Sequence, residues 1–216
     1  MQGVKFDDKH SYYHWGLMLR SRPVISPPTP KTKYVEVPGA DGAIDMTDLL
    51  TGYTQYQNRQ ISFKFILMAG REKWPAIYSD LLDTLHGRKV KITFDDDPDY
   101  YYTGRVTVDK WDAEKVTAII TMSAEVEPFK TERVGKTKNI IATGEGETVT
   151  IQGSVKPVVP SITTSDEGVQ VAFRGETYTL AEGVNRIPSI VIREGENEFT
   201  FTGSGTVEIA YKGGRF

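Results

Sequence analysis

Two histidines near the start of the chain have a spacing that could bind a metal ion. His10 and His14 are four residues apart, as in a helical metal pair, but no glutamate stands between them. The segment runs into a predicted strand, where residues four apart are separated by roughly 13 Å. One ion cannot reach both side chains at that separation, so the sequence predicts no metal site here.

The acidic run from Asp95 to Asp99 could bind calcium, because carboxylates are ligands that this ion prefers. It lacks the glycine and the downstream glutamate of an EF-hand loop. We expect the run to form a turn with Pro98 between two strands, and a calcium site is the alternative.

Three consecutive tyrosines follow these aspartates and could stack on a sugar ring. Aromatic faces beside carboxylates suit carbohydrate hydroxyls. The simpler interpretation is an edge strand on which Tyr100 and Tyr102 share one face and Tyr101 points into the core. We favour the strand, and sugar binding is the alternative.

No combination of residues indicates catalysis. The sequence contains no Gly-x-Ser-x-Gly segment, no Walker motif and no Gly-x-Gly-x-x-Gly segment after a strand. With 29 acidic residues, a pair of carboxylates suited to a glycoside hydrolase can always be found and carries no specificity. That enzyme class is only a third hypothesis. We predict a protein that is not an enzyme, with no catalytic residues, metal or cofactor.

Charge and composition exclude further classes of protein. The 216 residues include 26 basic and 29 acidic ones, and the net charge of −3 gives no general attraction to nucleic acid or to an anionic membrane. Cysteine is absent, which excludes disulfides, thiolate metal sites and cysteine nucleophiles. No apolar stretch approaches the roughly 20 residues that span a bilayer. The first residues lack the pattern of a signal peptide, so we expect a soluble chain made in the cytosol.

The apolar periodicity predicts the elements that must position these residues. One helix is expected from Arg71 to His86, where apolar side chains recur every three or four residues before Gly87 as the C-cap. This helix should cover the sheet face that carries Phe63 and Phe65. Alternating apolar residues predict strands at 15–22, 33–37, 59–68, 89–94, 101–111 and 115–126, with a hairpin between the last two.

The rest of the chain is predicted to be a small antiparallel β-sandwich. After residue 140, short apolar runs separated by glycines recur at intervals of roughly eight to twelve residues, and no helical pattern interrupts them. The composition changes in the charged stretch 130–139. We therefore expect a mainly β protein with an α+β domain at 1–135 and a sandwich at 136–216.

A proline-rich stretch lies between two of the predicted strands. Residues 23–30 contain four prolines and predict an extended, exposed loop. Beyond it, glycines flank Asp41 in the segment from Pro38 to Gly42, which suits a tight turn with positive φ.

In their order along the chain, these elements resemble the amino-terminal domain of the distal tail proteins of phages with long non-contractile tails. The resemblance covers residues 1 to about 130 and depends more on the order of elements than on any one motif. The segments that carry it are Phe6, 10–17, 20–23, the turn at 33–42, Ile44-Asp45, Tyr53, Tyr56 to Arg59, 61–65, the helix at 71–86 and the hairpin that ends at Glu127-Pro-Phe129.

In that family, the amino-terminal domain is related to tail-tube subunits and closes into a hexameric ring at the end of the tube. The carboxyl-terminal domain is commonly a galectin-like or carbohydrate-module-like β-sandwich, which agrees with our separate prediction for 136–216. The resemblance implies a structural protein of the virion tail tip, assembled in the host cytoplasm, that joins the tail tube to the tail tip or baseplate. The short second domain argues against a direct role in host attachment.

The resemblance also implies several partners. They are further copies of the chain in one ring or two stacked rings, the tail-tube protein and a tail-tip protein, with a receptor-binding protein as a further candidate. We expect residues 26–33 and 38–56 to reach a neighbouring subunit or the tube, because extended arms and open strand edges invite another chain. The predicted contact residues are Pro27, Pro28, Pro30, Lys33, Asp41, Tyr53, Tyr56 and Arg59. No recognition of a nucleic-acid sequence and no membrane insertion is expected.

Two alternatives are open at this point. In the first alternative, the proline-rich stretch is a disordered surface loop. In the second, the chain is a carbohydrate-binding module that contacts the host cell wall through Tyr100–Tyr102 or through the aromatic residues of the sandwich, which has no tryptophan. Those residues are Phe173, Tyr178, Phe199, Phe201 and Tyr211.

Overall fold

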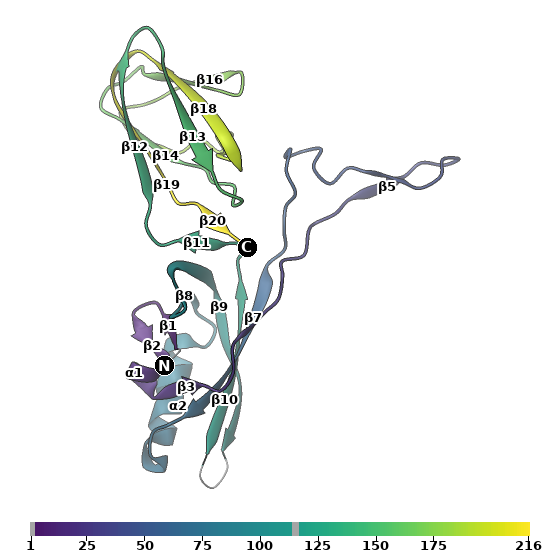
Figure 1. Cartoon of the computed structure of the whole chain (residues 1–216), viewed down its shortest axis with the longest axis vertical. Helices are drawn as coiled ribbons and strands as arrows, with labels where there is room; N and C mark the ends of the chain where they lie inside the picture. The colour runs from purple at the N-terminus through teal and green to yellow at the C-terminus, as the bar shows by residue number, and fades with distance from the viewer. Residues whose placement is uncertain (1–2, 114–116) are drawn as a thin grey trace. The chain divides into compact units, whose positions relative to one another are not determined.

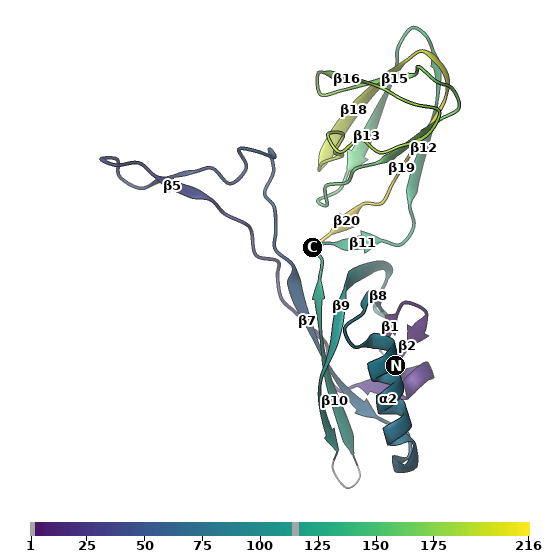
Figure 2. The ribbon, with the colours of Figure 1, turned by 180° about the vertical axis from the view of Figure 1, so that it is seen from behind.

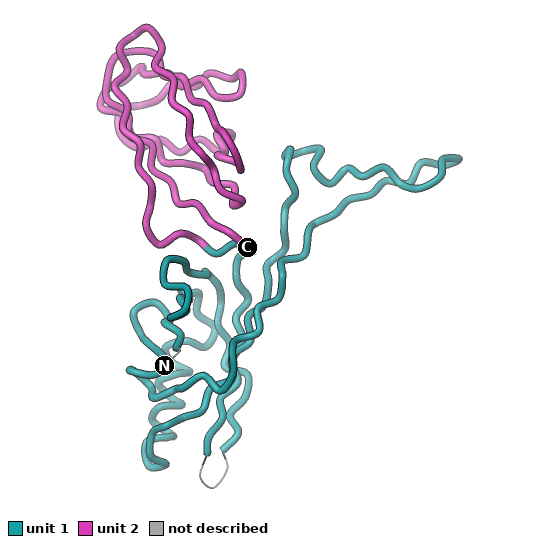
Figure 3. Tube along the Cα trace, in the orientation of Figure 1, with its two compact units in different colours: residues 1–130 teal, residues 131–216 magenta. Residues whose placement is uncertain are grey.

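The computed structural model describes residues 3–113 and 117–216 of the chain. The chain divides into two compact units, unit 1 at residues 1–130 and unit 2 at residues 131–216 (Figure 3). Strands predominate in both units, which confirms the prediction of a mainly β protein.

Unit 1 is built on one antiparallel sheet with the strand order β2-β1-β8-β9-β10-β7-β3, and β4 also pairs with β7 (Figure 1). The bounds of these strands are β1 (Val4–Phe6), β2 (Lys9–His10), β3 (Leu17–Leu19), β4 (Val24–Ile25), β7 (Arg59–Leu67), β8 (Lys89–Phe94), β9 (Asp97–Ala113) and β10 (Ala118–Val126). The antiparallel pairing of β9 with β10 confirms the predicted hairpin, although residues 114–116 lie outside the described part.

The inner face of the sheet carries the core of unit 1. Burial alternates along β7, so that Ile61, Phe63 and Phe65 point inward and are fully buried. The 3-10 helix η1 (Arg71–Lys73) leads into α2 (Trp74–Leu85), whose Leu81 and Leu85 belong to the same core. The expected packing of this helix on the face of Phe63 and Phe65 is confirmed. No helix in the described ranges is long and apolar enough to cross a membrane.

The segment after β2 is a short helix, α1 (Ser11–Trp15), which contains His14, whereas His10 ends β2, so the two histidines do not lie together on one strand as predicted. The His10 Nδ1 accepts the backbone N–H groups of Tyr12 and Tyr13 and so caps the helix. Gly16 ends the helix in the left-handed conformation. The strand predicted at 15–22 is shorter than expected and begins after this helix, as β3.

Tyr102, and not Tyr101 as predicted, points into the core. Tyr102 is buried, at 5% exposure, and Tyr101 lies outward with the Lys91 ammonium 5.3 Å from its ring. Tyr102 pairs with the buried Ile92 of β8, and cross-strand partners share one face of a sheet. In addition, β9 is flanked by β8 and β10, so it is not an edge strand. Only Asp95 and Asp96 form the turn, since β9 begins at Asp97.

Unit 2 is a sandwich of two four-stranded sheets, with the strand orders β12-β19-β14-β17 and β13-β18-β15-β16. Its core includes the fully buried Phe199, Phe201 and Ile209. The strand bounds are β12 (Lys136–Thr143), β13 (Glu147–Gly153), β14 (Ser161–Thr164), β15 (Gln170–Phe173), β16 (Glu176–Thr179), β17 (Gly183–Asn185), β18 (Gly195–Thr202) and β19 (Ser204–Tyr211), and the short β11 (Lys130–Glu132) pairs with β20 (Gly214–Arg215).

Two details of unit 2 differ from the predicted pattern. Strand β12 begins within the charged stretch 130–139. Its first half shows no apolar alternation in the sequence, because only Ile140 and Ala142 in its second half point inward. Residues 189–192 form no strand, and Ile192 makes a single bridge to Val158.

Gly104 of β9 has no room for a side chain. A methyl group there would collide with the backbone oxygen of Glu125 and with Val126 on the adjacent β10. At Gly70, in contrast, the nearest atoms that a methyl group would meet belong to the movable carboxylate of Glu72.

We therefore expect Gly104→Ala to lower the free energy of unfolding of unit 1 by about 1–3 kcal/mol, because the strand must shift to relieve the overlap. Gly70→Ala is the matched control and should change it by less than about 1 kcal/mol. Urea unfolding followed by tryptophan fluorescence measures this, since Trp15, Trp74 and Trp111 all belong to unit 1. Equal losses for the two variants would contradict the packing at Gly104.

Candidate assembly interface

The chain between β4 and β7 forms a long two-stranded ribbon that extends away from the sheet of unit 1 (Figures 1 and 2). We call residues 26–58 the arm. Backbone hydrogen bonds join the two sides of the ribbon. The Ser26 N–H donates to the oxygen of Gln60 in β7 at 3.0 Å, and farther along the arm the Lys31 N–H donates to the oxygen of Gln55 at 2.7 Å. The arm is therefore an ordered extension of β7, and the alternative of a disordered loop does not describe it.

The far end of the arm is a small hairpin of β5 (Tyr34–Glu36) and β6 (Ala43–Asp45). The connecting turn includes a hydrogen bond from Ala40 N–H to the oxygen of Val37 at 3.1 Å. Gly39 and Gly42 have φ values of 83° and 76°, as expected for glycines that flank Asp41 in a tight turn. Neither β5 nor β6 has a second partner strand in the described structure, so each leaves one edge open.

A polar corner holds the base of this hairpin. The Thr47 N–H donates to Asp45 Oδ1 at 2.9 Å, and the Lys33 N–H donates to Thr47 Oγ1 at 3.1 Å. The hydroxyl of Thr47, followed by its backbone N–H, lowers the pKa of the Asp45 carboxyl below the usual range. These bonds fix the hairpin although it has no core beneath it.

A second loop follows, and Leu49 and Leu50 lie at its surface. The Gly52 N–H donates to the oxygen of Asp48 at 2.7 Å, and Thr54 Oγ1 donates to Asp48 Oδ1 at 3.0 Å. These bonds close the loop without burying its two leucines, and Leu50 is 91% exposed.

Exposed apolar side chains are concentrated between β4 and the second loop. Of fifteen large apolar residues that are exposed in the described structure, eight belong to this short part of the chain. They are Val24, Ile25, Tyr34, Val35, Val37, Ile44, Leu49 and Leu50. They are spread along the ribbon, and so many exposed apolar side chains in one short segment favour a segment that another molecule covers.

Two contacts hold the base of the arm against the sheet. The rings of Tyr56 and Phe129 meet edge to face at 5.8 Å between centroids. The Asn58 Nδ2 donates to Glu125 Oε1 of β10 at 3.0 Å. The next residue, Arg59, begins β7, so the arm continues directly from the strand that carries the core.

The structure places most of the predicted contact residues on the arm. Pro27, Pro30, Lys33 and Asp41 are exposed along it, and Pro28, Tyr53 and Tyr56 are partly buried within it. Pro30 and Tyr56 face each other across the ribbon in one bridge. Arg59 differs, because it is buried on the inner face of β7.

The apolar residues of the arm are not among the contact residues predicted from the sequence. Asp45 and Asp48 stand between Ile44 and the pair Leu49 and Leu50, so these apolar residues show no strand or helix periodicity. Apolar residues without periodicity, in a segment rich in turn residues, are the signal that could have indicated them.

The histidines and the acidic run take structural roles. His10 Nε2 lies 3.2 Å from Asp95, and His14 Nε2 lies 3.6 Å from Asp80 at a separate position. The described residues contain no group of three or more histidine and carboxylate side chains that could hold a metal ion.

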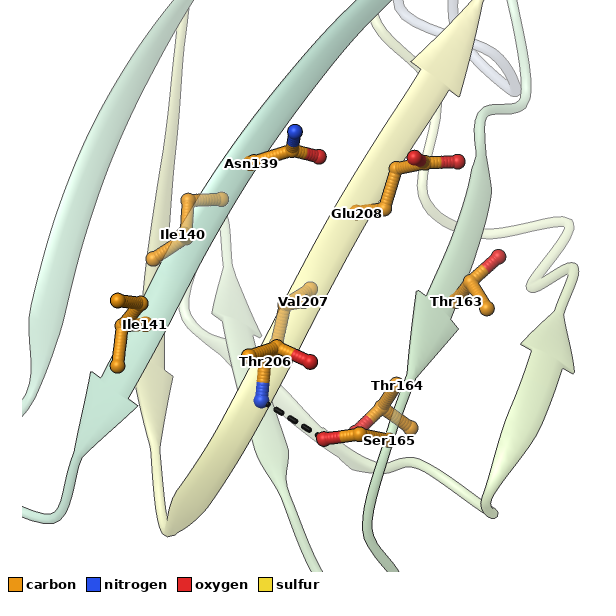
Figure 4. A pocket seen from close by; sticks show the side chains of 9 residues that line it. All are labelled: Asn139, Ile140, Ile141, Thr163, Thr164, Ser165, Thr206, Val207 and Glu208. Carbon is orange, nitrogen blue, oxygen red and sulfur yellow. Dashed lines mark hydrogen bonds between the residues drawn. The ribbon is translucent and has the colours of Figure 1, made fainter.

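A groove of about 590 Å³ lies on the β12, β14 and β19 side of unit 2 (Figure 4). Asn139, Thr163, Thr206 and Glu208 line it with polar groups, and Ser165 Oγ accepts the Thr206 N–H at 2.9 Å. None of its nine lining residues is aromatic.

The comparisons with known proteins identify the fold. Neither a scan against models of protein families nor a search of curated proteins found a match. Among solved structures, the chain is similar to the Dit protein (gp 19.1) of phage SPP1, which is described as a paradigm of the hub adsorption apparatus in phages that infect Gram-positive bacteria. The TM-score is 0.66 with 12% sequence identity, over 98% of this chain and 99% of that one. The resemblance to distal tail proteins is thus confirmed at the level of the fold, across both units.

Because the leucines of the second loop are exposed, we expect replacing Leu49 and Leu50 with serine to leave the free energy of unfolding unchanged within about 0.5 kcal/mol. The control is Leu81→Ala, which removes a fully buried side chain and should cost about 2–5 kcal/mol. Urea unfolding with tryptophan fluorescence compares the two. A comparable loss in both would mean that the arm contributes to the core of unit 1.

The hydrogen bonds of the polar corner predict how Asp45 titrates. The folded chain lowers the pKa of Asp45, so the corner is stabilised above the ordinary carboxyl range and loses this stabilisation as the pH falls through the lowered pKa. Thr47→Val removes the hydroxyl and should raise the Asp45 pKa toward its usual value. Carbon-13 NMR of the side-chain carboxyl measures both proteins, and an unchanged pKa would exclude the hydroxyl as the cause.

Proposed function

We propose that the chain is a structural subunit of a phage tail and that six copies form a hub ring joining the tail tube to the tail tip or baseplate. The observation that carries this proposal is the fold likeness over nearly the whole chain to a tail hub protein. The proposed site of action is the tail tip of the virion. The proposal includes no enzymatic activity.

The arm supports self-assembly on physical grounds. A two-stranded ribbon has no second layer to cover its side chains, and isolated hairpins are marginally stable in water. The arm nevertheless exposes apolar residues such as Ile44 and Leu50. Covering them with a neighbouring subunit removes this surface from water, which stabilises both the arm and the assembly.

The position of the arm favours a ring. It extends away from the sheet of unit 1 (Figures 1 and 2), so it can reach a surface on a neighbour that differs from the arm itself. Contacts between two different surfaces are heterologous, and they close into a ring when the rotation between subunits allows it. Hexameric closure, a stacked second ring, and contacts with the tail-tube, tail-tip and receptor-binding proteins are parts of the proposal that come from the family resemblance.

The groove of unit 2 does not favour the alternative of a carbohydrate-binding module. Sugar platforms commonly present an aromatic face, and the groove has none. Phe173, Phe199 and Phe201 are buried in the sandwich core, while Tyr178 and Tyr211 pack against it. Tyr102 is also buried, so the three tyrosines of β9 do not form one platform.

The proposal is tested by measuring the mass of the purified chain with light scattering over a concentration series and by negative-stain imaging. Six or twelve copies around a central opening are expected. A strict monomer at every concentration would contradict a ring that assembles from this chain alone.

A variant in which a short glycine-containing turn replaces residues 28–57 tests the arm. It should retain the unfolding midpoint of unit 1, because the core residues are untouched, and it should lose the ring. If the ring persists without the arm, the contacts between subunits lie elsewhere.

A further inference from the structure

Arg59 is a buried cation without an acceptor. The side chain is 7% exposed, and its Nε and Nη2 atoms are buried with no hydrogen-bond partner among the described residues. Its guanidinium lies 4.9 Å from the centre of the Tyr102 ring. No ion pair in the described structure involves Arg59.

An arrangement of this kind is unfavourable for the free chain. A guanidinium carries five N–H donors, and donors that are removed from water without an acceptor destabilise the folded state. Burial accordingly lowers the pKa of Arg59, opposed only by the interaction with Tyr102. A buried charge without a partner lowers the stability of the folded chain, and an acceptor from another molecule would offset this loss.

Arg59 occupies the junction between the arm and the core. It is the first residue of β7 and pairs with Val126 of β10, which in turn pairs with Gly104 of β9. To reach Tyr102 on β9, its side chain extends past β10. The third nitrogen, Nη1, is not among the buried unpaired atoms, so it is the point at which a partner can approach.

The arm supplies the complementary charge. Four carboxylates and no lysine or arginine occur between residues 34 and 58. Asp45 and Asp48 accept hydrogen bonds from Thr47 and Thr54 within the arm. The carboxylates of Glu36 and Asp41 accept none from the described residues.

The arm of a chain cannot place these two carboxylates on its own Arg59. Arg59 lies beside the start of the ribbon, where Ile25 pairs with Ile61. From Ile25 to Glu36 the ribbon advances by roughly 3.3 Å per residue, or about 35 Å in all. A Glu36 or Asp41 carboxylate that reaches Arg59 therefore belongs to another chain.

We infer that Arg59 receives a carboxylate, Glu36 or Asp41, from the arm of a second copy. The inference rests on the proposed ring and names one contact within it. A charge-assisted bond between guanidinium and carboxylate is directional, so it orients the incoming arm as well as holding it. Because the guanidinium is largely buried, salt screens this contact less than it screens an exposed ion pair.

The test uses a fluorescent, backbone-cyclised peptide of residues 33–48 added to the full chain at a concentration where the chain is monomeric. Fluorescence anisotropy should show binding. Arg59→Met fills a similar volume without buried donors and should weaken the Kd at least tenfold, while the unfolding midpoint is unchanged or higher. Lys64→Met removes a cation from the exposed face of the same strand and should change the Kd less than twofold.

A second peptide with Glu36→Gln and Asp41→Asn tests the contact without altering the protein, so a folding defect of Arg59→Met cannot decide the result. It should bind the unaltered chain at least tenfold more weakly and should show no further loss with Arg59→Met. Independent losses would show that Arg59 and the two carboxylates do not meet.

The outcomes separate this inference from the proposed function. Rings of the unaltered chain together with equal peptide binding by Arg59→Met and Lys64→Met would overturn the contact and leave the hub ring standing. Peptide binding that depends on Arg59, in a chain that never forms rings, would retain the contact and contradict the ring. A lower unfolding midpoint with unchanged peptide binding would make Arg59 a packing residue of the core.

Discussion

Unit 1 depends on the alternation of side chains along β7. All nine residues of this strand pair with β10, and the inner row carries Phe63 and Phe65, whose rings stack at 5.9 Å between centroids. Leu81 and Leu85 of α2 complete the same core. A shift of the register by one residue would turn every outward polar side chain of β7 inward, so the buried row fixes the pairing of the whole sheet.

The same strand determines where the arm leaves the unit. Because β7 continues the ribbon without a break, the hydrogen bonds that start at Ser26 and Gln60 extend the order of the core into the arm. The ribbon has no second layer, however, and its apolar side chains remain in water. Order without burial is explained if the arm contributes its free energy to an assembly and not to the fold of one chain.

Unit 2 is different because its two sheets cover each other. Phe199, Phe201 and Ile209 are fully buried, and the exposed Ile141 and Val184 are single residues on separate strands. The likeness to a tail hub protein extends over this unit at 12% identity. A sandwich requires alternation and turns at suitable intervals more than particular residues, so the fold tolerates such divergence.

The sequence by itself determined the features that depend on local periodicity. These are the mainly β class, the helix that begins near Arg71, the strand with Phe63 and Phe65, and the glycine turn around Asp41, because each follows from neighbours a few residues away. The contact residues proposed on the arm were likewise chosen from the order of segments, and the exposed positions of Lys33 and Asp41 are compatible with that role.

Only the tertiary structure decided the features that depend on distant partners. Tyr102 turns inward because it pairs with Ile92, and Arg59 is buried because β7 continues its inner row to the base of the arm. Neither follows from residue type, since tyrosine and arginine are found on both sides of a sheet. Which face a side chain takes is set by strand register, and register is fixed by the summed packing of residues far apart in the sequence.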